Sequence, residues 1–416
     1  MRKVKIALIG AGDRGKDRYG AYGLQFSDKV EFVAVAEPNE LRRNEFVQEH
    51  NISAENIFTT WEELLSKEKL ADGIIIATQD DMHYEPTKQA LQKGYDVLLE
   101  KPMSNDLNET VQLGELAKQY DNTFMICHVL RYTPFFSKIK EVIDSGIIGD
   151  VMTVQHNENI AYYHMAHSFV RGNWRNSDES SPIILAKSCH DMDIISWLVG
   201  ERCTKISSFG HLSHFTESNH PENASDRCLV CAVEPDCPYS AKKLYYANLG
   251  NWPTSVVTDI QTEESLTKAL NEGPYGRCVY KCDNNVCDHQ VSILEFEKGI
   301  TATFNLSAFT EKQNRTLKIM GTKGEIRGID TENKIEVRIF ASNEYQLIEP
   351  NLLAGGHGGG DTGIMNDFVD LLNGKSGKAL TSADVSVESH IMAFAAEHSR
   401  LTGKSVEIKK FYDEKV

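Results

Sequence analysis

The sequence contains no long hydrophobic run, and this absence excludes membrane-spanning proteins. None of its apolar stretches approaches the roughly 20 residues that a helix needs to cross a bilayer. The N-terminus, MRKVKIALIG, begins with basic residues, but its apolar part is short and runs directly into GAGDRG without a cleavage site. We therefore expect a cytoplasmic protein with no membrane partner.

Blocks of lysine and arginine are also missing. The 416 residues include 44 Lys and Arg against 60 Asp and Glu, which gives a formal net charge of −16 at pH 7. No basic stretch could follow a phosphate backbone, so a nucleic acid is not an expected partner. Internal repeats and low-complexity tracts are absent as well. What remains is a globular chain that is long enough for two domains.

Cysteine is sparse except in one region. Six of the nine cysteines lie at about 216–290, which we call the cysteine-bearing segment. In a reducing compartment, thiols indicate metal binding or simple burial rather than disulfides. A C-x-x-C pair with more thiols nearby suits a structural Zn²⁺ ion, although the spacing matches no common zinc finger or ferredoxin. Free buried thiols and a zinc site both remain open, and the candidate ligands are Cys228, Cys231 and Cys237, with Cys278 or Cys282 as the fourth.

What the sequence does contain, at its start, is a pattern typical of dinucleotide binding. A β-branched run leads into glycines with the spacing G-x-G-x-x-G, and a helical stretch and a second strand follow. These glycines are Gly10, Gly12 and Gly15. They allow a tight turn and let a pyrophosphate approach the backbone at the helix N-terminus. The pattern therefore predicts an NAD or NADP site.

The residues after the second strand bear on the choice between these cofactors. The strand ends on Glu37, which is placed to accept hydrogen bonds from the adenosine ribose hydroxyls and to repel a 2′-phosphate. NAD is therefore the expected cofactor. Arg42 and Arg43 follow closely and could bind a 2′-phosphate, so NADP remains the less favoured alternative.

Strands and helices then alternate through the first part of the chain. Apolar runs such as GIIIA and YDVLLE are each followed by a helical pattern, and TFMICHVL closes the series. This predicts an α/β fold in residues 1–128, a doubly wound parallel sheet of the Rossmann type. Longer alternating strands dominate afterwards. They predict an α+β domain in residues 129–416, with a largely antiparallel sheet, helices on one face, and the cysteine-bearing segment as an insertion.

Several motifs in this order resemble the Gfo/Idh/MocA family of oxidoreductases, which includes glucose–fructose oxidoreductase and inositol dehydrogenase. They are the glycine turn, ATQDDMH, the EKP of LLEKPM, RYTPFFSKIKEVIDSGIIGDV, CHDMDIISWLVG and IMGTKGEI. The resemblance implies an NAD(P)-binding Rossmann domain, a second domain whose sheet builds a homodimer or homotetramer, and a substrate pocket between them. The family's usual reaction moves a hydride from a sugar or polyol carbinol to nicotinamide.

The resemblance also assigns candidate catalytic residues. The lysine of EKP, Lys101, would lie at the pocket, and the family's general base falls on His190, a residue type that titrates near neutrality. The family's aspartate four residues earlier is replaced by Ala186, with Lys187 beside it. This second cation could lower the pKa of His190 or place a substrate hydroxyl. Alternatively, Asp191 or Asp193 could orient the imidazole.

Other candidates surround these residues. Near the cofactor we expect, besides the glycines and Glu37, four side chains: Thr78, His83, Glu100 and Lys101. Near the substrate we expect Arg131, Tyr132, Trp174, Arg175, Asp193 and His357. For the junction residues Arg131, Tyr132, Trp174 and Arg175, packing between the domains is the alternative.

The sequence leaves three functions open. The favoured one is an NAD-dependent dehydrogenase that acts on the CH–OH group of a sugar, sugar derivative or polyol. The glycine-rich stretch AGGHGGGDTG around His357 also resembles NAD-dependent glycosidases related to this family, which oxidise their substrate only transiently. The replacement at Ala186 leaves, as a third hypothesis, a cofactor-binding sensor without turnover.

Overall fold

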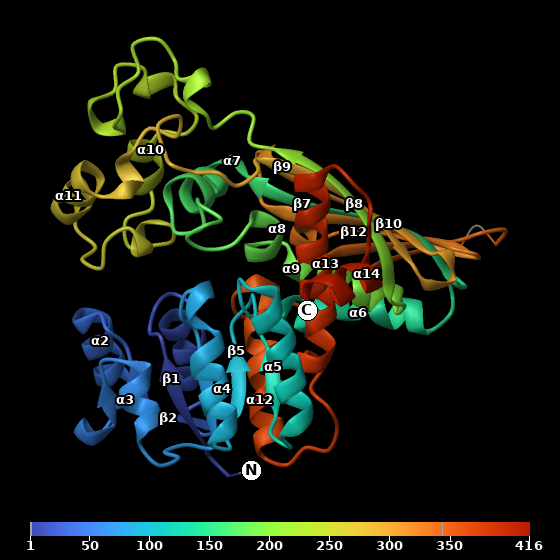
Figure 1. The fold of residues 1–416 in the computed structure, drawn as a ribbon, viewed down its shortest axis with the longest axis horizontal. Coiled ribbons are helices and arrows are strands. Elements are labelled where there is room, and N and C mark those ends of the chain that lie inside the picture. The colour runs from blue at the N-terminus through green and yellow to red at the C-terminus, as the bar shows by residue number, and fades with distance from the viewer. Residues whose placement is uncertain (1, 343) are drawn as a thin grey trace.

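The first part of the chain forms a parallel sheet of six strands in a computed structural model that describes residues 2–342 and 344–416 (Figure 1). The strand order is β3-β2-β1-β4-β5-β6, and every neighbouring pair is parallel. The order reverses between β1 and β4, which is the place where open α/β sheets bind ligands at their carboxyl ends. The strands are β1 Val4–Ile9, β2 Val30–Ala36, β3 Ile57–Phe58, β4 Gly73–Ile76, β5 Asp96–Leu99 and β6 Phe124–Ile126. This confirms the predicted Rossmann fold.

Helices cover both faces of this sheet, so β4 is buried along its whole length. The glycine turn leads into a π-helical stretch, Gly15–Gly20, that continues as α1. Side chains cap the starts of the longer helices: Asn39 accepts a hydrogen bond from Arg42 N in α2, and Asp106 accepts one from Glu109 N in α5. The helices are α1 Ala21–Gln25, α2 Glu40–His50, α3 Trp61–Ser66, α4 Tyr84–Gln92 and α5 Leu107–Gln119.

A second sheet of nine strands follows, in the order β14-β13-β12-β11-β7-β10-β9-β8-β15. All neighbours are antiparallel except β7 and β10, which confirms the predicted largely antiparallel sheet. Buried and exposed residues alternate along β9, because helices cover only one face. The strands are β7 Val151–Ala161, β8 Cys203–His211, β9 His289–Phe296, β10 Thr301–Thr310, β11 Asn314–Gly321, β12 Gly324–Ile329, β13 Lys334–Ile339, β14 Tyr345–Ile348 and β15 Val406–Glu407.

Helices α8, α9 and α13 of the second part lie between its sheet and the first part (Figure 1). The longest of them is α13. It packs against α5 on one side and against α9 and β8 on the other, so it is buried on two sides. Gly114 of α5 makes room for it, since a Cβ there would lie 2.4 Å from Val387 Cγ2. The helices are α6 Pro134–Asp144, α7 Tyr162–His164, α8 Ile183–Ala186, α9 Cys189–Val199, α13 Ala383–Thr402 and α14 Ile408–Lys415.

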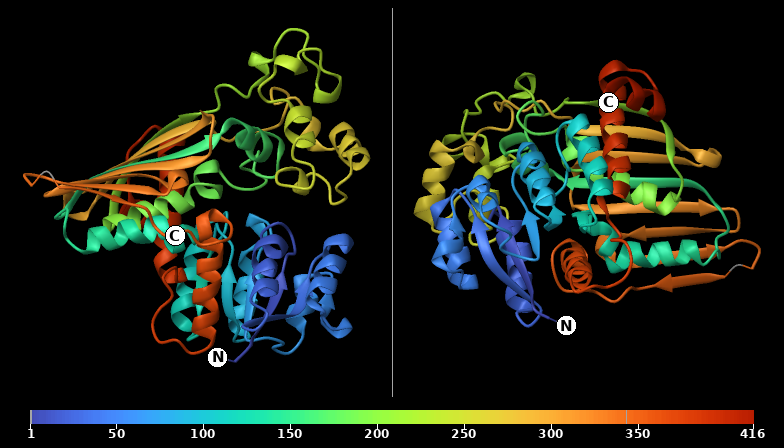
Figure 2. Two further views of the ribbon diagram at one scale, coloured as in Figure 1. Left: turned by 180° about the vertical axis from the view of Figure 1, so that it is seen from behind. Right: turned by 60° about the horizontal axis from the view of Figure 1, so that its bottom comes forward.

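One helix returns to the first sheet from far along the chain. Helix α12, Gly360–Leu372, shares an apolar cluster with strands β1 and β2 through Ile364, Met365 and Phe368 (Figure 2). Its close approach depends on Gly73 in β4, where a Cβ would lie 2.9 Å from a Phe368 ring atom. Residues from both ends of the chain thus build the Rossmann part, and the domain boundary at residue 128 stays a prediction.

The cysteine-bearing segment has two helices, α10 Ala241–Tyr246 and α11 Glu263–Glu272. It has a small apolar core of its own, which includes Tyr245, Leu266 and Leu270. Figure 1 shows these helices on the side of the molecule where α2 and α3 lie. Arg42 of α2 hydrogen-bonds to Asp259, so this part of the segment contacts the Rossmann part.

Candidate active site

The glycine turn has the shape that a pyrophosphate needs. Gly10 has a φ of +89°, which favours glycine, and a Cβ at Gly15 would lie only 1.9 Å from the carbonyl oxygen of Gly10. A Cβ at Gly12, in contrast, would meet no atom within 4 Å. The backbone at Gly12 is therefore open to a ligand, and the helical stretch begins three residues later, at Gly15.

Glu37 lies directly after β2 and is 5% exposed. Its Oε2 accepts a hydrogen bond from Ala11 N at 2.7 Å, and its Oε1 accepts one from Asn39 N at 2.8 Å. The carboxylate therefore joins the glycine turn to the start of α2. Each oxygen keeps a second lone pair, so both can still accept a hydrogen bond from a ribose hydroxyl.

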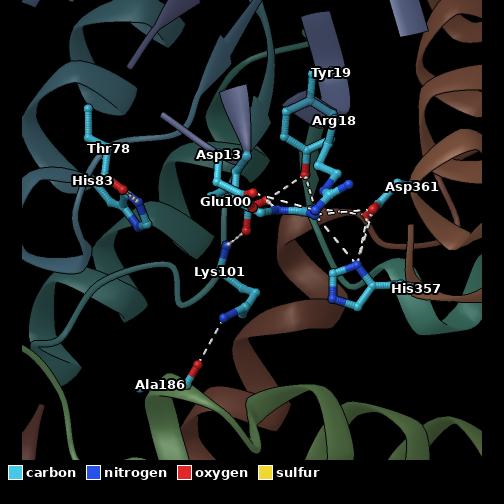
Figure 3. A network of polar contacts seen from close by, with 11 residues as sticks. Asp13, Arg18, Tyr19, Thr78, His83, Glu100, Lys101, Ala186, His357 and Asp361 are labelled. Atoms are coloured by element: carbon cyan, nitrogen blue, oxygen red, sulfur yellow. Dashed lines mark hydrogen bonds and ion pairs between the residues drawn. The ribbon is translucent and has the colours of Figure 1, made fainter. Parts of the chain in front are cut away.

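Arg14, inside the glycine turn, is the centre of a polar network (Figure 3). Its Nε donates to Glu100 Oε1 at 2.5 Å, and its NH2 group donates to Asp361 Oδ1 at 2.9 Å and to the Tyr19 hydroxyl at 2.7 Å. Burial alone would raise the pKa of Glu100, but the charges of Arg14 and Lys101 lower it below its usual range. Glu100 is therefore ionised and anchors the turn that holds Lys101.

The Lys101–Pro102 peptide is cis. Lys101 N donates to Glu100 Oε2 at 3.1 Å, and Lys101 Nζ donates to the carbonyl oxygen of Ala186 at 2.9 Å (Figure 3). Ala186 is the last residue of α8, which belongs to the second part of the chain. The side chain of Lys101 thus spans the boundary between the two sheets.

His83 lies between this turn and Thr78, which follows β4. His83 Nδ1 lies 2.6 Å from the carbonyl oxygen of Pro102, and Nε2 lies 3.3 Å from that of Thr78. The Thr78 hydroxyl donates to Met82 O at 3.1 Å. The ring of His83 is therefore occupied by backbone carbonyls, and its contacts fix two strand-end loops.

His190 lies in the first turn of α9 and is 5% exposed. Among the described residues its Nδ1 has no hydrogen-bond partner. Burial lowers the pKa of His190 well below its usual range, and the charge of Lys101 lowers it further. The imidazole is therefore neutral at pH 7 and able to accept a proton. Its ring centroid lies 6.1 Å from that of His357.

Lys187 faces a buried carboxylate rather than His190. Its Nζ lies 3.5 Å from Glu158 Oε1, and Arg315 NH2 lies 2.5 Å from Glu158 Oε2. Burial lowers the pKa of Lys187, and the charges of Arg315 and Lys101 add to this, whereas Glu158 opposes it. Of the cationic side chains Arg14, Lys187 and Arg315, only Lys187 has a lowered pKa, so it loses its proton most readily.

The two aspartates proposed to orient His190 are engaged elsewhere. Asp191 Oδ1 accepts hydrogen bonds from His156 Nε2 and Arg315 Nε, both at 2.8 Å. Asp193 accepts two from Arg131, both at 2.7 Å. In the part of the chain that the structure describes, neither carboxylate hydrogen-bonds to His190. This arrangement does not support the interpretation that one of them orients the imidazole.

The four predicted substrate residues at the junction all have protein partners. Besides the Arg131 pair with Asp193, the Tyr132 hydroxyl donates to Asp367 at 3.0 Å and Trp174 Nε1 donates to Asp80 at 3.2 Å. Arg175 donates to both oxygens of Asp283 at 2.8 Å. These contacts favour the alternative of packing between parts of the chain, for all four residues.

His357 does lie next to the network. Its Nδ1 is 3.1 Å from both oxygens of Asp361 and 3.5 Å from Arg14 NH1. The stretch predicted as a glycine loop is only partly a loop, because α12 begins at Gly360. His357 is thus held at the start of a helix and faces the same region as His190.

Sequence reasoning missed Arg14, Asp361, Asp80 and Glu158. Arg14 gave one signal, a charged residue between the glycines of a dinucleotide-binding pattern. Asp361 gave none, because its partner Arg14 is 347 positions away in the chain. Asp80 accepts from Trp174 and from Ser181, so it joins the first sheet to the second part of the chain.

The structure does not support the predicted zinc site. All nine cysteines are free thiols, and within residues 2–342 and 344–416 no group of three or more His, Cys, Asp or Glu is arranged to hold a metal ion. Cys282 Sγ donates to Cys278 O, and Cys231 Sγ accepts from Ser225 N at 3.3 Å. Cys228 Sγ accepts from Arg171 at 3.4 Å. These thiols serve local hydrogen bonds instead.

No helix in the described part of the chain is both long and apolar enough to cross a membrane.

Comparison with known proteins identifies the class that this fold and site define. The profile of an oxidoreductase family with an NAD-binding Rossmann fold matches residues 4–128, and that of the same family's C-terminal alpha/beta domain matches residues 140–408. The chain is thus an oxidoreductase with an NAD-binding Rossmann domain. More particularly, it belongs to the Gfo/Idh/MocA family, as its motifs predict.

Individual relatives have related names. YteT of Bacillus subtilis (strain 168), which carries the name of an oxidoreductase, is 27% identical over 319 residues, covering 71% of this chain and 72% of YteT. Inositol 2-dehydrogenase of Corynebacterium glutamicum (strain R) is 22% identical over 211 residues, 49% of this chain and 57% of that protein. The structure of levoglucosan dehydrogenase with NADH and L-sorbose superposes with a TM-score of 0.72 at 17% identity, over 98% and 99% of the two chains. That likeness shows the shared fold.

Proposed function

We propose that the protein is an NAD-dependent oxidoreductase that transfers a hydride between nicotinamide and a carbinol carbon of a sugar, sugar derivative or polyol. One observation carries this proposal. Lys101 Nζ reaches from the carboxyl end of β5 to the carbonyl oxygen of Ala186, four residues before His190. This contact brings the strand-end lysine to the segment of the second part that leads into α9, where the neutral His190 lies.

The chemistry assigns each side chain a task. Oxidation of a CH–OH group requires the hydroxyl proton to leave while the carbon loses a hydride, and bound NAD accepts that hydride. His190, held neutral by burial and by Lys101, takes the hydroxyl proton. The Lys101 ammonium stabilises the negative charge that develops on the same oxygen. In the reverse direction His190 returns the proton.

The preference for NAD is supported by the positions of the two arginines that could bind a 2′-phosphate. Arg43 NH1 donates to Glu37 O at 2.6 Å, and Arg42 Nε donates to Asp259 at 2.8 Å. Both guanidinium groups are therefore engaged by protein oxygens. NAD(H) should bind at least tenfold more tightly than NADP(H), a difference of ~1.4 kcal/mol.

A cavity beside His357, lined by apolar as well as polar side chains, offers room for a small polyhydroxylated substrate. Its volume is about 310 Å³, within the range of small-molecule sites. Arg315, one of its lining residues, also contributes to the lowered pKa of His190, so the cavity and the base are close. Its other polar lining residues are Thr133, Gln313, Asn314, Asp330, Thr331, Asn333 and His357.

The test is turnover with a panel of sugars, anhydrosugars and polyols in the presence of NAD, followed by NADH absorbance. Accumulation of NADH with any member supports the proposal. The second candidate, an NAD-dependent glycosidase, is favoured by one observation: His357 gives the site a second imidazole within 6.1 Å of His190. Such an enzyme would release product from a glycoside without accumulating NADH, so the same assay separates the two.

We also propose that the nine-stranded sheet builds a homodimer or homotetramer. Its open face exposes apolar side chains on neighbouring strands, with Phe209 59% and Ile293 52% exposed. Light scattering should show a dimer or tetramer for the unmodified protein. The double substitution Phe209→Lys and Ile293→Lys should shift it to monomer, and an unchanged mass would exclude this face.

A further inference from the structure

One aspartate of the cysteine-bearing segment contacts the start of α2. Asp259 Oδ1 accepts a hydrogen bond from Arg42 Nε at 2.8 Å, and Asp259 Oδ2 accepts one from Asn39 Nδ2 at 3.0 Å. Asp259 and Arg42 are 217 positions apart in the sequence. The insertion thus reaches across to the Rossmann part, on the side where Figure 1 shows α11 and α2.

The loop that carries Asp259 is held in place by its own contacts. The hydroxyls of Thr258 and Ser265 lie 2.8 Å apart, and Gly250 N donates to Gln261 Oε1 at 3.0 Å. The side chain of Asp259 is 26% exposed. It is therefore a half-buried and fixed carboxylate rather than a mobile surface group.

The contact lies next to the acid that marks the adenosine ribose. Asn39 donates its backbone N–H to Glu37 Oε1 at 2.8 Å and its side-chain amide to Asp259. The carboxylates of Glu37 and Asp259 are therefore linked through a single residue, Asn39. Tyr275 of the same segment is also close, because the charge of Arg42 opposes the rise of its pKa that burial causes.

We propose that Asp259 is a specificity residue for the cofactor. It holds the guanidinium of Arg42 away from a 2′-phosphate, and it adds a second negative charge beside Glu37. The ligand that this pair of carboxylates accepts is an adenosine ribose with a free 2′-hydroxyl. This inference rests on the proposed use of NAD and assigns part of the cofactor site to the cysteine-bearing segment.

The test is the ratio of NADPH to NADH affinity, measured by calorimetry on the full chain. In Asp259→Ala, the released Arg42 should raise the affinity for NADPH about tenfold, while that for NADH stays within about threefold. The gain should vanish in Asp259→Ala with Arg42→Ala, because Arg42 supplies the phosphate contact. Asp236→Asn, at an exposed aspartate of the same segment, is the matched control and should leave both affinities unchanged.

An unchanged ratio in Asp259→Ala, or a gain that persists without Arg42, would overturn the proposal. If Asp259→Ala loses affinity for both dinucleotides, Asp259→Asn takes its place. It removes the charge but keeps the size, and at least a threefold gain for NADPH is required. An unmodified protein that binds neither dinucleotide would instead refute the proposed use of NAD, and this inference with it.

Discussion

The two sides of the candidate site are built differently. On the cofactor side, Glu37 and Glu100 each accept backbone N–H groups, and Arg14 and Asp361 are paired with each other. On the substrate side, the Nδ1 of His190 has no partner in the described structure, and Lys187 lies beside a buried carboxylate with a lowered pKa. The first side is preorganised by the backbone, so single side-chain changes should affect it little. The second depends on a few side chains that are poised to exchange protons.

The largest expected effect comes from Lys101, which lies between the two sides. Lys101→Met should lower turnover by ~10²–10⁴-fold, because a polarising group is lost from the reacting oxygen. The affinity for NAD should change less than about threefold, since the glycine turn provides the pyrophosphate contacts. Steady-state kinetics and a binding titration measure the two quantities. Lys118→Met, at an exposed position of α5, is the control, and full activity in Lys101→Met would make this lysine a surface group.

His190 tests whether the substrate side acts as a unit. His190→Ala should lower turnover by ~10²–10⁴-fold, because the proton acceptor is removed. The double variant with Lys101→Met should be little worse than either single variant, as is usual for groups that act on one atom. Losses that multiply in the double variant would show that the two residues act in separate steps.

A substitution of Lys187 tests whether this residue of the substrate side contributes to kcat/KM. Lys187→Met removes a charged hydrogen-bond donor, which is worth about 1.5–3 kcal/mol, so kcat/KM should fall about tenfold to hundredfold. Glu158 keeps Arg315 as its partner in this variant, so the fold should persist. An unchanged kcat/KM, with the protein correctly folded, would mean that Lys187 only balances the charge of Glu158.

Buried histidines such as His167 should make the protein sensitive to acid. Burial lowers the pKa of His167 to about 3, whereas an unfolded histidine titrates near ~6.5. Below pH ~6.5 the histidine of the unfolded chain binds a proton, whereas folded His167 stays neutral. The free energy of unfolding therefore falls as the pH falls. The slope is about 1.4 kcal/mol per pH unit until the folded pKa is reached.

Chemical denaturation at about pH 6 and 5 measures this loss. His167→Gln should flatten the pH dependence of the unfolding free energy by about 1 kcal/mol over that interval. His211→Gln, at an exposed position, should leave the dependence as it is. Equal slopes in the unmodified protein and His167→Gln would show that another group controls the acid response.

The fold of the cofactor side was predictable from the sequence because its signals are local. The glycines, the strand before them and Glu37 lie within one strand–helix–strand unit, and each has a backbone reason to be there. The pairs of charged side chains around the site were not predictable in this way. Arg14 and Asp361, or Lys187 and Glu158, come together only through packing of distant elements, and no periodicity records such a pairing.

The residues at the junction of the two parts show the same limit of prediction from sequence. Arg131, Trp174 and Arg175 have residue types that suit sugar binding, but each is satisfied by a carboxylate of the protein itself. Residue type alone cannot distinguish a side chain that waits for a ligand from one that already has a partner. Only the hydrogen-bond partner decides between these roles.

Helix α12 has a consequence for how the protein is made. During synthesis the six strands of the first sheet leave the ribosome long before residues 360–372, yet these residues cover part of that sheet's apolar surface. Until they arrive, the side of the sheet at Gly73 and Ile6 is bare and open to aggregation. A fragment that stops at residue 128 should therefore be less soluble than the full chain. Folding of the cofactor site is in this sense a late event, because it waits for a helix that is translated long after the last strand of its sheet.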